Sequence, residues 1–184
     1  MISIRGTSEI GDFLQDLKFK QAVFDHHENV FIENAKVHFG FMEQYLALKT
    51  PVLTFVKESI ANIKIDEIIV TGHSLGGAVA AMLGVLLSQE VKDVLTRVVT
   101  FGSPTPGDAK FQCLFNSNVK KHTRIVLPND PVPAAFGRIF YWYRNGLLLC
   151  NFLSLIIPIQ AEKDTHASLD RKTNSSVTMT LFCR

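Results

Sequence analysis

The chain has 184 residues, of which 47% are hydrophobic and 20% are charged, a composition typical of a soluble globular protein. Nineteen basic side chains against 17 acidic ones leave a net charge of +2, and the basic residues form no stripe, so nucleic acid is not an expected partner. We expect a single domain, residues 1–184, because domains commonly contain about 100 to 200 residues.

The sequence shows neither a secretory signal peptide nor a transmembrane segment. The start, "MISIRGTSEI", lacks the charged-then-apolar layout of a secretory signal. We therefore expect a cytoplasmic or peripheral membrane protein rather than a secreted one, unless the chain is a mature form. The longest apolar run, Leu147–Ile159, covers 13 positions and is interrupted by polar residues and Pro158. A bilayer span needs about 20 residues, so this run is too short to be one.

The first expected elements are a short strand, "ISIRG", and an amphipathic helix. Ile10, Phe13, Leu14 and Leu17 recur at helical spacing. A longer helical pattern runs from about Val37 to Ile63 and is expected to kink or restart near Pro51.

The middle of the chain alternates strands with helices. "EIIVTG" (67–72) is a run of apolar residues typical of a strand buried on both faces of a parallel sheet. "AVAAMLGVLLSQEV" (78–91) follows as a helix, then "RVVTFG" (97–102) and "TRIVLPND" (123–130) as two further strands. This alternation predicts an α/β fold.

Ser74 lies between two glycines in "VTGHSLGGAVAAML". The pattern G-x-S-x-G is a nucleophile elbow when a strand precedes it and a helix follows it, and both are expected here. Gly72 and Gly76 remove side chains that would collide across the turn, and the new helix offers free N–H groups to a developing negative charge. The sequence therefore predicts that Ser74 is a nucleophile; an idle serine in a glycine-rich turn is the alternative.

A nucleophilic serine needs a base, and the base needs an orienting acid. In this fold the order is Ser, then Asp or Glu, then His. Two histidines follow Ser74. His122 lies at the entrance to a strand, at the opposite edge of the sheet, whereas His166 follows the last strand expected from the sequence, so we favour His166 as the base.

Asp130 is favoured as the acid because it directly follows a buried strand, in a loop that Pro128, Pro131 and Pro133 stiffen. Asp108 also follows a strand, although farther along the chain. Asp164 lies two residues before His166 and is interpreted as a solvated side chain. A simple turn before proline remains the alternative for Asp130.

No cofactor and no metal ion are expected. "GSPTPGDA" has the glycine spacing of a phosphate loop but carries Asp108 in place of the lysine. His26 and His27 lack a ligand cluster and are interpreted as loop residues. Cys113, Cys150 and Cys183 lie far apart, and we interpret them as buried or free thiols, with a disulfide between two of them as the lesser alternative.

With these residues in view, the chain resembles the class 3 lipases, the fungal-lipase-like branch of the α/β-hydrolases. The family pattern is matched in order by "IRGT", "VHFGFMEQY", "VTGHSLGG", "VVTFGSPTPGDAKF", "RIVLPNDPVP", "YRNG" and "DTHASL". The resemblance implies an α/β-hydrolase fold with a central, mostly parallel sheet flanked by helices. It also implies a serine carboxylic-ester hydrolase that acts on acylglycerols or related lipid esters.

The resemblance assigns Ser74 as the nucleophile, Asp130 as the acid and His166 as the base. It makes Thr7 an oxyanion-hole residue beside the N–H group of Leu75; a threonine that caps the next helix is the alternative for Thr7. The resemblance also makes the helix expected at 8–19 a lid over the acyl site, which we expect to open at lipid surfaces. An ordinary packed helix is the alternative.

The same resemblance bears on partners and completeness. Apart from the resemblance, the large apolar residues of the stretch 140–159 are interpreted first as a core strand, with the lining of an acyl groove or contact with a membrane or lipid-droplet surface as the alternatives. Members of the family carry additional helix and strands before the oxyanion strand, so we expect a fold that is minimal, truncated at the N-terminus or completed by a partner. A lipase-like protein that binds a lipid or a signalling partner without turnover is the alternative function.

Overall fold

The computed structural model describes residues 1–6, 21–24, 34–127, 130–133 and 177–179. A five-stranded sheet has the order β6-β5-β4-β1-β7. Its strands are β1 (Ile2–Ile4), β4 (Glu67–His73), β5 (Leu95–Phe101), β6 (Lys121–Ile125) and β7 (Val177–Met179). The first four are parallel and β7 is antiparallel to β1. The expected α/β fold with a mostly parallel sheet is confirmed.

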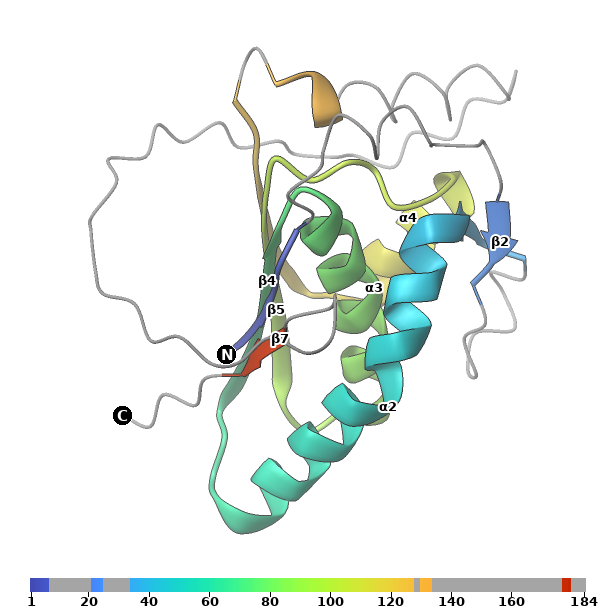
Figure 1. The fold of residues 1–184 in the computed structure, drawn as a ribbon. Coiled ribbons are helices and arrows are strands. Elements are labelled where there is room, and N and C mark those ends of the chain that lie inside the picture. The colour runs from blue at the N-terminus through green and yellow to red at the C-terminus, as the bar shows by residue number, and fades with distance from the viewer. Residues whose placement is uncertain (7–20, 25–33, 128–129, 134–176, 180–184) are drawn as a thin grey trace.

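In the described part of the chain, three helices lie on the same side of this sheet (Figure 1). They are α2 (Phe39–Asn62), α3 (Leu75–Glu90) and α4 (Ala109–Asn118), with α3 against the strands and α2 and α4 packed on α3. α3 is the central one: every residue from Gly76 to Leu87 is buried, and the helix contacts β1, β4, β5, α2 and α4. The segment that begins immediately after Ser74 is therefore held by the core of the protein.

The two faces of the central strands differ in burial. In β4, Ile68 and Val70 are buried against the helices, whereas Ile69 and Thr71 on the opposite face are half-buried. β5 alternates in the same way. The expectation that these strands are buried on both faces is wrong for the residues described, because α2, α3 and α4 all cover the same face.

A second, two-stranded sheet pairs β2 (Gln21–Val23) with β3 (Lys36–His38) in antiparallel register. Neither strand was expected from the sequence. Val37, predicted to start the long helix, lies in β3, and α2 begins at Phe39. The His38 side chain caps α2 by accepting a hydrogen bond from the Gly40 amide at 3.2 Å. α2 then continues through Pro51 without the predicted restart.

Two further expectations need correction. β6 ends at Ile125, so Asp130 lies five residues beyond the strand rather than directly after it. β7 follows His166 in the chain, so His166 does not come after the last strand. The helix expected around Ile10–Leu17 and the apolar run 147–159 lie outside the described residues.

Among the described residues, no helix combines the length and the hydropathy that a bilayer crossing requires. No group of three or more His, Cys, Asp or Glu side chains in the described ranges could hold a metal ion. His26, His27, Cys150 and Cys183 lie outside those ranges, while Cys113 is half-buried on α4.

Candidate active site

Ser74 occupies a sharp turn between β4 and α3. Its backbone has φ 53° and ψ −129°, a combination that costs a non-glycine residue free energy and persists only when its surroundings fix it. The Ser74 carbonyl accepts a hydrogen bond from the Gly77 amide at 2.9 Å, and the Ser74 amide donates to the Phe101 carbonyl at 2.9 Å. The strained conformation is thus fixed from both α3 and β5, as a nucleophile elbow requires.

The glycines beside Ser74 allow two backbone contacts that no side chain would permit. A Cβ atom added to Gly72 would lie 2.3 Å from the Gly76 carbonyl oxygen. One added to Gly76 would lie 2.3 Å from the Ile4 carbonyl oxygen, at the end of β1. The expected role of these glycines is confirmed, and the contact with Ile4 brings the end of β1 to the turn.

Leu75 is the first residue of α3. Its amide belongs to the first turn, whose N–H groups have no acceptor inside the helix and carry the positive end of the helix dipole. An oxygen that becomes negative beside Ser74 would face this end of α3. The position of Leu75 therefore suits an oxyanion-hole donor.

Asp130 lies beyond the carboxyl end of β6. Its Oδ1 accepts a hydrogen bond from the Val132 amide at 3.0 Å, and its own amide donates to the Leu127 carbonyl at 3.2 Å. Its Oδ2 lies close to Gly102: a Cβ atom added to Gly102 would be 2.8 Å from Oδ2. The carboxylate thus lies beside Gly102, the residue that follows β5. The residue before it, Phe101, supplies the carbonyl that accepts the Ser74 amide.

Gly102 is a position beside the candidate site that was not among the residues predicted from the sequence. Its φ is +53°, in the left-handed region that glycine adopts without steric cost. The side chains of Asp130 and His73 both approach its bare Cα: an added Cβ would lie 3.5 Å from His73 Nε2. The sequence does carry a signal for this position, because Gly102 directly follows β5, the strand next to the one that leads to Ser74.

The rival residues weighed in the sequence have structural roles. Asp108 caps α4, where its Oδ1 accepts hydrogen bonds from the Phe111 amide at 2.9 Å and the Lys36 amide at 3.2 Å. His122 is the second residue of β6, with its ring against Phe115 at a centroid distance of 5.2 Å. Because β4 and β6 run in the same direction, His122, near the start of β6, lies toward the amino ends of the strands, whereas Ser74 lies at their carboxyl ends.

Burial lowers the pKa of His122. Burial also lowers the pKa of Arg124, while attraction to Asp130 acts in the opposite direction and raises it. The second effect shows that the charges of Arg124 and Asp130 lie close enough to interact.

Of the five site residues predicted from the sequence, the described structure contains three. Ser74 and Leu75 are adjacent at the start of α3, and Asp130 lies beside Gly102 at the same edge of the sheet. Thr7 and His166 lie outside the described residues. Gly6 is described, and a Cβ atom added to it would lie 3.4 Å from Ser74 Cβ, so the chain reaches the nucleophile elbow one residue before Thr7.

A family model described as lipase (class 3) matches residues 1–140. A lipase from Rhizomucor miehei is 30% identical over 156 residues, which are 79% of this chain and 42% of the fungal protein. A lipase structure from Rhizopus microsporus var. chinensis aligns with a TM-score of 0.65 at 29% identity, over 74% of this chain and 47% of that one.

Another solved structure aligns with a TM-score of 0.64 at 26% identity, over 75% of this chain and 53% of that one. It is described as a triacylglycerol lipase whose catalytic centre is a serine protease triad. The chain thus spans about half the length of the relatives it matches.

Proposed function

Because the chain belongs to the class 3 lipase family, we propose that it hydrolyses carboxylic esters of acylglycerols or related lipids, with Ser74 as the nucleophile. The observation that carries the proposal is the strained backbone of Ser74, φ 53°, at a joint between a buried strand and a buried helix. Such strain is maintained where it serves the placement of a reactive group. The lipases among its relatives support a lipid ester as the substrate.

In the proposed reaction Ser74 Oγ attacks the ester carbonyl carbon while His166 takes the hydroxyl proton. The tetrahedral intermediate collapses, the C–O bond to the alcohol breaks, and His166 returns the proton to the leaving alkoxide. The acyl group remains on Ser74 until a water molecule, activated by His166, attacks and releases the fatty acid. Asp130 orients His166 and stabilises its positive charge. The proposed reaction requires no cofactor.

The proposed oxyanion hole combines the amide of Leu75 with Thr7. Leu75 begins a helix of 16 residues, and its amide lies at the positive end of the helix dipole. Gly6 lies against Ser74, which favours a position for Thr7 near the same oxygen. Loss of one oxyanion donor typically lowers kcat by about 10² to 10³.

We also propose that the protein acts at a lipid surface, as a peripheral protein of a membrane or a lipid droplet. The Ser74 residue is only 2% exposed. A dissolved ester therefore reaches Ser74 Oγ only after the groups that cover it move. The resemblance to class 3 lipases implies a lid over the acyl site that makes this movement at a lipid surface.

The same burial favours a second candidate, a lipase-like protein that binds lipid without turnover. An idle serine in a buried turn would give the same low exposure, but it would not react with an electrophile. The two candidates differ in the reactivity of Ser74 and can be separated by a covalent probe.

The test is labelling of the full chain with a fluorescent fluorophosphonate, in the presence of detergent micelles. An activated serine attacks the phosphorus and displaces fluoride, whereas an idle serine does not. We expect one label, located by mass spectrometry in the peptide that contains Ser74 and absent from Ser74→Ala. The control is Ser117→Ala, an exposed serine on α4, which should label as the wild type does. A folded protein that takes no label at Ser74 would contradict the proposal and favour the binding protein.

A further inference from the structure

The turn Phe101–Ser103 connects the nucleophile to the loop that carries the acid. The Phe101 carbonyl accepts the Ser74 amide at 2.9 Å, and the Gly102 amide donates to the Ile125 carbonyl, the last residue of β6, at 2.8 Å. Gly102 also borders Asp130 Oδ2. A displacement of this turn would therefore change the distance between Ser74 and Asp130.

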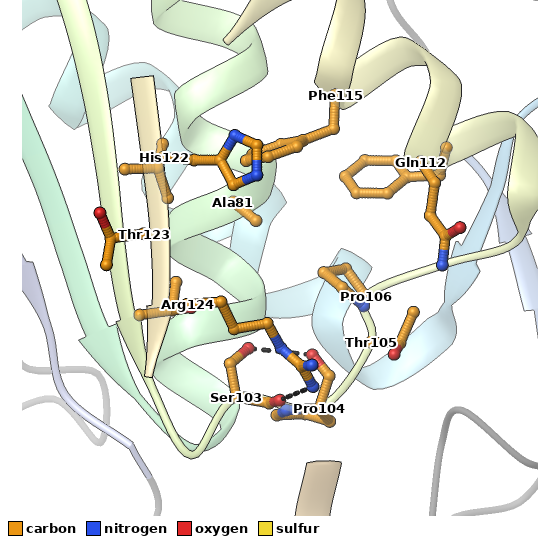
Figure 2. A pocket seen from close by; sticks show the side chains of 13 residues that line it. Ala81, Ser103, Pro104, Thr105, Pro106, Gln112, Phe115, His122, Thr123 and Arg124 are labelled. Atoms are coloured by element: carbon orange, nitrogen blue, oxygen red, sulfur yellow. Dashed lines mark hydrogen bonds between the residues drawn. The ribbon is translucent and has the colours of Figure 1, made fainter. Parts of the chain in front are cut away.

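One side chain from β6 holds the third residue of this turn. Arg124 Nη2 donates a hydrogen bond to the Ser103 carbonyl oxygen at 2.8 Å. Figure 2 shows the Arg124 side chain leaving β6 and reaching across to Ser103 and Pro104. The Ser103 hydroxyl donates to the Pro104 carbonyl at 2.9 Å, so the carbonyl and the hydroxyl of Ser103 are both engaged.

Ser103 in turn packs under the start of α3. It is 3% exposed, and a Cβ atom added to Gly77 would lie 2.7 Å from Ser103 Cβ. Gly77 is the residue whose amide donates to the Ser74 carbonyl. Arg124 thus fixes a carbonyl that is packed directly against the first turn of the helix behind the nucleophile.

The charge of Arg124 acts on the other half of the site. Burial lowers the pKa of Arg124, and the attraction of Asp130 offsets part of that effect. A permanent positive charge near the acid favours its ionised form and disfavours a second positive charge on the base that the acid orients. A buried arginine keeps its charge across the whole range in which an esterase works.

We propose that Arg124 is a positioning residue of this active site, which fixes the Phe101–Ser103 turn through the Ser103 carbonyl. The expected effects on kcat and on the pH profile rest on the ester hydrolysis proposed above. The expected fixing of the turn by Arg124 does not depend on that activity. Arg124 does not touch the reacting atoms; it acts through Ser103.

The charged groups around Arg124 are few in the described structure. The residues that line the pocket beside it come from α3, β5, the loop 103–106, α4 and β6, and their titratable side chains are Arg124 and His122. Burial lowers the pKa of His122, which keeps this ring neutral near pH 7. Asp130 approaches from the loop after β6. Any effect of Arg124 on the pH profile must therefore be separated from an effect of His122, which provides the matched control.

The test compares Arg124→Lys, Arg124→Met and His122→Gln in the full chain. For Arg124→Met we expect kcat to fall by about 10-fold to 10²-fold with KM nearly unchanged, as for misplaced catalytic groups. The acidic limb of the kcat/KM profile should move to higher pH, because loss of a positive charge raises the pKa of a neighbouring base. Arg124→Lys should keep the limb in place but lower kcat, because lysine lacks the planar donor pair. His122→Gln should change neither.

A second measurement works without turnover. Hydrogen exchange of the Ser74 and Gly102 amides should accelerate by about 10-fold or more in Arg124→Met, and by less than about 3-fold in His122→Gln, when both are folded. Unchanged exchange together with an unmoved acidic limb would overturn the proposal. If the wild type hydrolyses no ester, the proposed function fails, while the exchange rates still decide whether Arg124 fixes the turn.

Discussion

The Ser74 amide donates a hydrogen bond to the Phe101 carbonyl at 2.9 Å, which ties the turn after β4 to the end of β5. This bond crosses between adjacent parallel strands at their carboxyl ends, where open α/β sheets bind their ligands. The next residue, Gly102, borders Asp130. The two described members of the proposed triad are therefore linked through one short turn, and changes in that turn should alter catalysis before they unfold the protein.

Gly102→Ala tests the link most directly. The new Cβ would lie 2.8 Å from Asp130 Oδ2, on a residue with φ +53°, and the left-handed conformation alone costs a non-glycine residue about 1 to 2 kcal/mol. We expect kcat to fall by about 10² because Asp130 is displaced, while urea unfolding shows a loss of only about 1 to 3 kcal/mol. Wild-type kcat in a stable Gly102→Ala protein would mean that Asp130 does not act from this position.

The contacts of the elbow glycines predict a difference between two alanine substitutions. Gly76→Ala places a Cβ 2.3 Å from the backbone oxygen of Ile4, whereas Gly84→Ala meets a side-chain methyl of Val98 at 2.4 Å. A methyl group shifts more readily than a strand, and alanine improves helix propensity by about 1 kcal/mol. We expect Gly76→Ala to cost more than about 3 kcal/mol and Gly84→Ala less than about 2 kcal/mol. Equal losses in urea unfolding would argue against a rigid elbow.

Burial lowers the pKa of His122 from its ordinary value of 6.5. The unfolded chain therefore binds more protons than the folded one between the lowered pKa and about 6.5, so stability rises with pH across that window and is lost as the pH falls through it. We expect the stability advantage of the wild type over His122→Gln, measured by thermal unfolding, to be smaller at pH 5 than at pH 8, by a few degrees at most. A larger stability advantage of the wild type at pH 5 than at pH 8 would mean that folding raises the pKa of His122 rather than lowering it.

The 2% exposure of Ser74 predicts a dependence on the physical state of the substrate. If covering groups open at a lipid surface, the specific activity on a short-chain triacylglycerol should rise when the substrate passes its solubility limit. Titration of substrate across that limit measures this, with a soluble p-nitrophenyl ester as the control. Activity that follows one saturation curve without a rise would show that no interface is needed.

The elements that the sequence predicted well are those determined by neighbouring residues. The elbow at Ser74 needs a buried strand, a glycine-flanked serine and a helix, and all lie within "EIIVTGHSLGGAVAAML". Asp130 was chosen as the candidate acid by its place after a strand, although β6 ends earlier than expected, and its role stays a prediction.

The elements that the sequence did not predict depend on distant partners. Val37 is completely buried in β3, but its hydrophobic spacing continues into α2, so periodicity alone assigned it to the helix. In β3, Lys36–His38 pair with Gln21–Val23, and Val37 also forms a bridge with Gly107, so both partners lie far away in the sequence. Arg124 contacts a carbonyl 21 residues earlier in the chain, and no local pattern indicates that contact.

The measurement that tests the central claim most directly is the hydrolysis of p-nitrophenyl esters, from short to long acyl chains, by the wild type, Ser74→Ala and the exposed-serine control Ser117→Ala. We predict that Ser74→Ala lowers turnover by about 10⁴ to 10⁶ while Ser117→Ala retains it. The chain-length optimum would then define the acyl preference. Equal turnover in the wild type and a folded Ser74→Ala protein, or none in a folded wild type, would contradict the assignment of Ser74 as the nucleophile.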